Sequence, residues 1–188
     1  MPLELVLARH GETEWSRDGR HTGRTDIPLT DEGRRQAERL APKLAEWSFA
    51  RVLSSPLARA LDTCRLAGLG DSVATTDDLL EWDYGEYEGI TTAEIRGSRP
   101  DWNLWRDGCP SGEAAADVGA RVDRVIAAVG DLDGPVALFA HGHVLRVLTA
   151  RWLGLDAHDG ALFALGTGTL SVLGYERETR VIRRWNAP

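Results

Sequence analysis

The nine residues PVALFAHGH, from Pro135 to His143, decide the fold class of this 188-residue chain. Their first six residues are all apolar, and a short run of this kind is typical of a strand buried on both faces of a sheet. The apolar stretch 144–155 follows at once and predicts a helix. A buried strand that passes directly into a helix indicates an α/β sheet with helices on both of its faces.

The rest of the chain repeats this alternation of strands and helices. Thr30 can cap the helix that begins at residue 31, but Pro42 conflicts with an unbroken helix and predicts a kink or a break. Residues 169–175 and 180–185 alternate around the sequence ERET, which predicts a hairpin or paired strands. The remaining predicted elements are strands at 3–8, 50–53 and 73–75 and helices at 57–69 and 114–129.

Two clusters of polar residues follow two of these strands. Arg9 and His10 come directly after the strand 3–8, and the cluster 141–143 comes directly after the strand 135–140. In α/β sheets, ligands bind beyond the carboxyl ends of the strands. We therefore expect both clusters at one edge of the sheet, where a ligand binds.

The residue types at this edge suit phosphoryl transfer. The neutral imidazole of His10 can attack phosphorus if its other ring nitrogen is held in place, and Arg9 can stabilise charge on the phosphoryl oxygens. His141 precedes a helix whose N-terminal amides attract anions, and Gly11 and Gly142 permit close approach of the backbone. A histidine that ends a single strand is more often a solvated loop residue, so the second cluster is what favours catalysis.

Two further residues extend this hypothesis. Arg59, in SSPLARALDT, is either an exposed helix arginine or a second clamp for a phosphate. Glu81, in EWDYGEYEG, is either a solvated loop acid or a general acid that protonates the leaving alcohol and then activates water.

The composition limits the partners of the chain. The formal net charge of −7 argues against a broad surface for nucleic acid or anionic membranes. It permits a small basic pocket, because a pocket is local. The two cysteines, Cys64 and Cys109, make neither a disulfide framework nor a metal-ligand spacing. With no signal peptide and no apolar run of membrane-spanning length, the sequence predicts a single cytoplasmic domain, 1–188.

Four stretches in one order carry a resemblance to a known family. RHGETEW, SSPLARALDT, EWDYGEYEG and HGH together resemble the histidine phosphatase superfamily, also called the phosphoglycerate mutase-like family. The resemblance implies an α/β fold, a three-layer α/β/α sandwich with a mostly parallel central sheet and a C-terminal antiparallel edge. It also implies phosphoryl transfer through a phosphohistidine, without a metal or another cofactor.

The resemblance assigns roles to individual residues. It implies that His10 is the nucleophile, that Glu81 is the proton donor, and that the phosphate is held by Arg9, Arg59 and His141. The implied substrate-binding residues are Ser16, Thr22, Gly23, Tyr84, Arg106 and Gly142. Ser16 stands where many members have asparagine. Arg106 is either a contact to a distal phosphate or sugar hydroxyl or a surface arginine beside packing tryptophans.

The finer resemblance concerns the substrate. RHTGRTDIPLT, EWDYGEYEG and WNLWRDGCPSGE are similar to metal-independent sedoheptulose-1,7-bisphosphatases and related bacterial acid phosphatases. This implies a phosphomonoesterase for small phosphorylated metabolites, such as sugar phosphates or sugar bisphosphates. The alternatives are a phosphoglycerate mutase and a non-catalytic phospho-ligand-binding member. A homodimer is also open, because the seven tryptophans could supply an interface or fill the core.

Overall fold

A central sheet of six strands organises the protein, whose computed structural model describes residues 3–188. The strand order is β3-β2-β4-β1-β5-β6. β1, β2, β3 and β4 pair in parallel, whereas β5 pairs antiparallel with both β1 and β6. The strands are β1 Leu5–Arg9, β2 Arg51–Ser54, β3 Val73–Thr75, β4 Val136–Ala140, β5 Leu170–Glu176 and β6 Thr179–Ala187.

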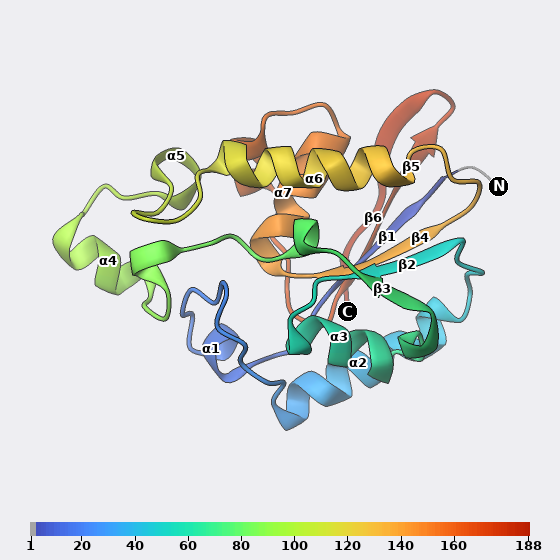
Figure 1. Cartoon of the computed structure of the whole chain (residues 1–188), viewed down its shortest axis with the longest axis horizontal. Coiled ribbons are helices and arrows are strands. Elements are labelled where there is room, and N and C mark those ends of the chain that lie inside the picture. The colour runs from blue at the N-terminus through green and yellow to red at the C-terminus, as the bar shows by residue number, and fades with distance from the viewer. Residues whose placement is uncertain (1–2) are drawn as a thin grey trace.

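Helices cover both faces of this sheet (Figure 1). α2 and α3 lie on one face, and α6 and α7 lie on the other. α1, α4 and α5 gather at the end of the molecule opposite the N-terminus. The α-helices are α1 Glu14–Arg17, α2 Asp31–Leu44, α3 Ala58–Leu66, α4 Thr92–Ser98, α5 Leu104–Asp107, α6 Ala115–Val129 and α7 Gly142–Trp152. The described residues also form four 3-10 helices in the loops: η1 Gly70–Ser72, η2 Asp77–Leu79, η3 Gly85–Tyr87 and η4 Ala157–Leu162.

The alternation of side chains along β1 and β4 divides the core in two. Successive side chains of a strand point to opposite faces. Leu5 and Leu7 of β1 therefore pack in the core beneath α6 and α7, while Val6 and Ala8 pack in the core beneath α2 and α3. This double burial explains why both central strands read as continuous apolar runs.

The three-layer α/β/α prediction is confirmed, and most predicted elements form with ends shifted by a few residues. Of the kink or break predicted at Pro42, the break does not form, because α2 continues through it to Leu44. Pro42 lies in the last turn on the exposed face, so the carbonyl that loses its partner faces solvent. The predicted C-terminal pair is a hairpin, β5–β6, with Arg177 of its turn at φ 55°.

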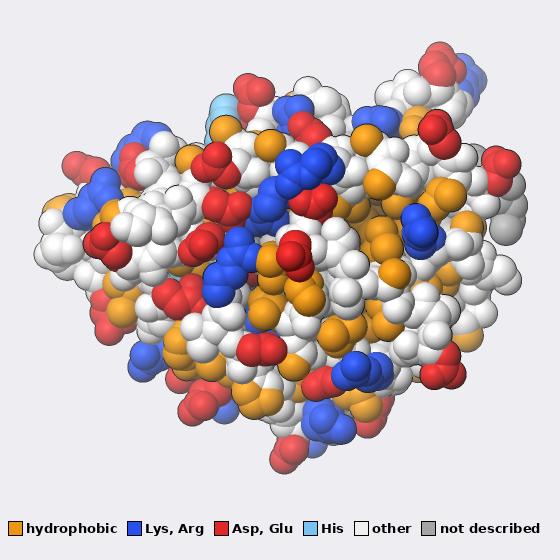
Figure 2. All heavy atoms as spheres, viewed as in Figure 1, with side chains coloured by type: hydrophobic (Ala, Val, Ile, Leu, Met, Phe, Trp, Pro, Cys, Tyr) orange, Lys and Arg blue, Asp and Glu red, His pale blue; other side chains and the backbone are white. Residues whose placement is uncertain are grey.

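Charge on the surface is mixed. On the face shown in Figure 2, basic and acidic side chains are interspersed. Some opposite charges pair directly, such as Arg151 and Asp123 at 2.9 Å. Within residues 3–188, no helix combines the length and the apolar character that crossing a membrane requires.

Candidate active site

The two polar clusters meet at the carboxyl ends of β1 and β4. Parallel pairing places Arg9 opposite Ala140, and the His10 amide donates to the Ala140 carbonyl at 3.0 Å. His141 follows Ala140 directly, and its ring meets the His10 ring edge-on, with centroids 5.2 Å apart. The register of two neighbouring strands therefore builds the centre of the site.

His10 is held as a neutral imidazole with one free lone pair. Its Nδ1 lies 2.7 Å from the carbonyl oxygen of Gly11. A carbonyl only accepts hydrogen bonds, so Nδ1 carries the hydrogen and Nε2 does not. Burial, and after it the positive charges of Arg59 and Arg9, lower the pKa of His10 well below its usual value of 6.5. The Nε2 lone pair is thus available at neutral pH.

The segment after His10 is locked against the helices on one face of the sheet. The Gly11 amide donates to Thr63 Oγ1 of α3 at 3.0 Å. A Cβ atom on Gly11 would lie 2.1 Å from the carbonyl oxygen of Gly33 in α2. Only glycine permits so close an approach of the two backbones. The segment that follows His10 is therefore packed tightly against α2 and α3.

Arg9 offers an unpaired donor beside His141. Its Nη1 donates to the Leu165 carbonyl, whereas its buried Nε has no partner among residues 3–188. A Cβ on Gly142 would lie 3.2 Å from the guanidinium carbon of Arg9. The charge of Arg9 therefore sits against the N-terminus of α7, where an anion binds favourably.

Arg59 joins a surface loop to His141. Its Nη atoms donate to the carbonyls of Thr22, Gly23 and Thr25 at 2.9 to 3.1 Å. Its Nε donates to His141 Nδ1 at 3.1 Å. The side chain is fully buried. It does not itself line the cavity described below. Arg59 therefore positions the loop and orients His141.

The ring of His141 has the opposite tautomer from His10. Because Nδ1 accepts from Arg59, Nε2 carries the hydrogen and donates to Ser55 Oγ at 2.8 Å. Burial, and after it Arg59, lowers the pKa of His141 well below 6.5. Ser55 was not among the predicted site residues. Its position in the sequence could have identified it, because Ser55 directly follows β2 and so lies at the same edge of the sheet as His10 and His141.

Glu81 is buried at the N-terminus of α7. Its Oε1 accepts from the amides of Trp82 and Val144, both at 2.9 Å. Its Oε2 accepts from the His143 amide at 3.0 Å. Oε1 thus has two donors and Oε2 has one, so Oε2 is the oxygen with a lone pair left for a proton.

Arg9, His10 and Glu81 line one cavity of about 320 Å³, whereas Arg59 and His141 lie behind its wall. Of the predicted residues, those that line it are Arg9, His10, Ser16, Thr22, Glu81, Tyr84 and Gly142. Lining residues that the sequence did not single out include Arg20, His21, Arg96, Trp102, Asn103, Trp105, His143 and Arg146. Half of these lie on α4, α5 and α7, namely Arg96, Trp105, His143 and Arg146, and the other half lie in the loops after α1 and before α5, namely Arg20, His21, Trp102 and Asn103. All except His143 lie outside the four motifs, so those motifs did not point to them.

Two predicted substrate-binding residues do not line this cavity. Gly23 donates its amide to Glu88 at 2.9 Å and accepts from Arg59. Arg106 is exposed and pairs with Asp107 at 2.7 Å. A larger groove of about 1040 Å³ does include Arg106, but none of the buried histidines lines it. The smaller cavity is therefore the candidate active site.

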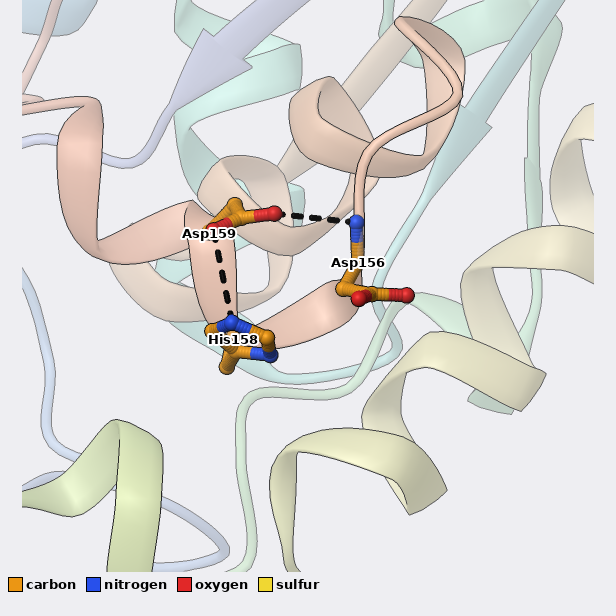
Figure 3. Close-up of side chains that lie close together, drawn as sticks. All are labelled: Asp156, His158 and Asp159. Carbon is orange, nitrogen blue, oxygen red and sulfur yellow. Dashed lines mark hydrogen bonds and ion pairs between the residues drawn. The ribbon is translucent and has the colours of Figure 1, made fainter.

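One group of possible metal ligands lies apart from the site. Asp156, His158 and Asp159, on η4 and the residue before it, each have a ligand atom within 4.8 Å of the others (Figure 3). Asp159 accepts from the Asp156 amide at 3.1 Å, and its other oxygen lies 3.4 Å from His158. This is the hydrogen bonding of a capped helix start. None of the three lines the cavity that contains His10.

Comparisons with known proteins agree with this geometry. The histidine phosphatase superfamily (branch 1) matches residues 5–188. Over 180 residues the chain is 46% identical to an acid phosphatase of Mycobacterium tuberculosis. The alignment covers 94% of this chain and 88% of the relative. Over 183 residues it is 39% identical to the sedoheptulose 1,7-bisphosphatase of Saccharomyces cerevisiae. That alignment covers 80% of this chain and 67% of the relative.

A solved structure gives the same result. The product of an open reading frame of Mycobacterium tuberculosis matches with a TM-score of 0.93 and 43% identity, over 98% of this chain and 97% of that one. The chain therefore belongs to the histidine phosphatase superfamily. It is a phosphatase, which confirms the enzyme class that its four motifs imply.

Proposed function

We propose that this phosphatase is a metal-independent phosphomonoesterase that works through a phosphohistidine. His10 Nε2 forms a bond to phosphorus while the ester bond between phosphorus and oxygen breaks. Glu81 gives its proton to the leaving alcohol oxygen. A water molecule then attacks phosphorus and gives a proton to Glu81, while the bond between phosphorus and His10 Nε2 breaks and inorganic phosphate leaves.

The tautomer of His10 is the observation that carries this proposal. Its Nδ1–H donates to the Gly11 carbonyl at 2.7 Å, which leaves Nε2 unprotonated at the edge where the cavity opens. Arg9 supports the proposal with an unpaired Nε–H for a phosphoryl oxygen. Glu81 supports it because Oε2 has only one hydrogen-bond donor.

The charge of the cavity supports a substrate with a second anionic group. Arg20, Arg96 and Arg146 line the cavity, and none of them pairs with a carboxylate among residues 3–188. Each is anchored instead by a hydrogen bond to a main-chain carbonyl at 3.0 to 3.1 Å, which does not neutralise its charge. Glu81 is the one acid in the lining.

We therefore propose small phosphorylated metabolites with two anionic groups, such as sugar bisphosphates, as the preferred substrates. The name of the yeast relative, sedoheptulose 1,7-bisphosphatase, is consistent with this proposal. We also propose that the enzyme acts in the cytoplasm as a single domain, 1–188. Its two free cysteines, Cys64 and Cys109, are buried, which suits a reducing compartment. A homodimer stays a prediction.

The experiment compares wild type with His10→Ala on an aryl phosphate. We expect the substitution to lower kcat/KM by at least about 1,000-fold, with an unchanged circular dichroism spectrum. His158→Ala, on the exposed surface away from the cavity, is the matched control and keeps wild-type activity.

Two further measurements separate the alternatives. Rapid acid quench with labelled substrate should trap acid-labile phosphate on the wild type and none on His10→Ala. A metal chelator should leave the rate of hydrolysis unchanged. Loss of activity in the presence of chelator would contradict the metal-independent route. Conversion of 3-phosphoglycerate to its 2-isomer, without release of phosphate, would show a mutase instead.

A further inference from the structure

His143 and Tyr84 form a hydrogen-bonded pair that the phosphoryl-transfer steps above do not use. The Tyr84 hydroxyl lies 2.6 Å from His143 Nδ1, and both residues line the cavity. Nδ1 also lies 3.9 Å from Glu81 Oε2, the proposed proton-carrying oxygen. The pair therefore stands beside the group that protonates the leaving alcohol.

Both members of the pair are neutral near pH 7. Burial, and after it the charges of Arg146 and His21, lowers the pKa of His143 well below 6.5. Burial, and after it the charge of Glu81, raises the pKa of Tyr84 well above 10. Each side chain therefore has one polar hydrogen to place.

The position of the tyrosine hydrogen follows from hydrogen-bond satisfaction. Tyr84 is 2% exposed, and His143 is the sole hydrogen-bond partner of its hydroxyl group among residues 3–188. If Nδ1–H donated to the hydroxyl oxygen, the buried tyrosine O–H would lack an acceptor, which is costly. The satisfied arrangement has the tyrosine O–H donating to Nδ1, so His143 carries its own hydrogen on Nε2.

That Nε2–H is open to the cavity. It has no partner among the described residues, and it is not among the buried atoms that lack one. The ring cannot turn easily, because it packs against Trp105 at 5.3 Å and Trp82 at 6.2 Å between centroids. The main-chain amide of the same residue donates to Glu81. The donor is therefore fixed on the leaving-group side of the site.

We propose that His143 is a specificity-determining residue that donates a hydrogen bond from Nε2 to a hydroxyl oxygen of the substrate's alcohol portion. Tyr84 is a positioning residue that holds the donating tautomer. The site then favours polyol and sugar esters over esters of alcohols without hydroxyl groups. This inference rests on the proposed phosphomonoesterase function.

The tautomer is tested first, without any turnover. A long-range ¹H–¹⁵N spectrum of the free enzyme at pH 7 should show the Nε2–H tautomer for His143 and the Nδ1–H tautomer for His10, the internal contrast. Tyr84→Phe should shift His143 toward a mixture and leave His10 unchanged. An Nδ1–H tautomer for His143 in the wild type would overturn the proposal.

The second test compares His143→Gln with His143→Leu on a sugar monophosphate and on phenyl phosphate. His143→Leu should lower the ratio of the two kcat/KM values by about tenfold, the effect of one hydrogen bond. His143→Gln, whose side-chain amide supplies an N–H in a similar position, should restore part of that ratio. Equal losses on both substrates would mean a merely structural role and would refute the inference.

The two levels of the proposal fail differently. If the wild type formed no phosphoenzyme, or if His10→Ala stayed active, the phosphomonoesterase proposal would fail. If those experiments succeed but the substrate ratio is the same in wild type and His143→Leu, only the role of His143 fails. Tm values of both variants within a few degrees of wild type show that the comparison concerns folded enzyme.

Discussion

The guanidinium of Arg121, on α6, donates from Nη2 to the main-chain carbonyl of Glu81 at 3.3 Å. The same side chain pairs with Glu113 at 2.7 Å and donates to the carbonyl of Leu80 at 3.0 Å. Arg121 thus fixes the main chain of Leu80 and Glu81, the proposed acid, although Arg121 itself does not line the cavity. In this way α6, which covers one face of the sheet, fixes the position of Glu81 at the edge of the sheet.

Arg121→Met should therefore lower both stability and activity. Removing one partner of a nearly buried ion pair, with several hydrogen bonds to carbonyls, costs about 2–4 kcal/mol of unfolding free energy. We expect kcat to fall more than KM rises, because Glu81 shifts while the phosphate site stays intact. Urea unfolding and steady-state kinetics measure the two effects.

Arg124→Met is the matched control on the same helix. Arg124 is exposed and pairs with Asp78 on the surface. Exposed pairs contribute roughly 0–1 kcal/mol, so this variant should resemble wild type in both measurements. Equal behaviour of the two variants would contradict the positioning role of Arg121.

Gly33→Ala tests the close approach of α2 to the segment after His10. A Cβ at this position would lie 2.0 Å from the carbonyl oxygen of Glu12, a backbone atom that cannot move aside cheaply. We expect a loss of several kcal/mol, or failure to fold, measured by thermal unfolding. Gly97→Ala in α4 is the control, since nothing lies within 4 Å of its added Cβ. It should stabilise by up to about 1 kcal/mol.

Arg96→Gln tests the second anionic group of the substrate. The guanidinium of Arg96 lines the cavity, donates to the Trp102 carbonyl at 3.0 Å and has no carboxylate partner within residues 3–188. We expect kcat/KM for a sugar bisphosphate to fall about tenfold or more, and that for phenyl phosphate to change little. Arg106→Gln, which alters the exposed arginine paired with Asp107, should change neither value. If Arg106→Gln lowered kcat/KM for the sugar bisphosphate and Arg96→Gln did not, Arg106 would be the residue that contacts the second phosphate.

Stability should fall with pH below about 6.5, because four histidines are neutral in the folded protein: His10, His21 and His141 are buried, and the side chain of His143 is 25% exposed. Burial lowers the pKa values of His10, His21, His141 and His143 from the usual 6.5. Between the folded and unfolded pKa values the unfolded chain binds more protons, so the free energy of unfolding falls as pH falls. The slope is about 1.4 kcal/mol per pH unit for each proton taken up.

Urea unfolding between pH 7.5 and pH 5 measures this slope. His143→Gln removes one of the four groups, so its slope should be shallower than that of the wild type. A free energy of unfolding that does not change across the range would contradict the neutral state of these histidines.

Much of the fold could be predicted because its determinants are local. The continuous apolar runs of β1 and β4 indicate central strands, since both faces of such strands are buried. The position of Arg9, His10 and His141 directly after those strands predicts that they meet, because parallel strands end at one edge. Both conclusions need only the order of residues along the chain.

The outer part of the site depends on contacts that local patterns do not contain. Arg96 and Arg106 lie ten residues apart in the sequence. The structure places Arg96 in the lining of the cavity, and Asp107 pairs with Arg106 outside it. The direction that each side chain takes is set by the packing of α4 and α5, which the spacing of residues does not record.

The sequence by itself determined the layered α/β fold, the family, and the histidines and arginine at the edge of the sheet. The tertiary structure alone decided which ring nitrogens carry hydrogens and which arginines remain unpaired in the cavity. The physical reason is that strands and helices follow from periodicity along the chain. Tautomers, ion pairs and cavity walls follow instead from neighbours that the fold brings together, such as Tyr84 and His143.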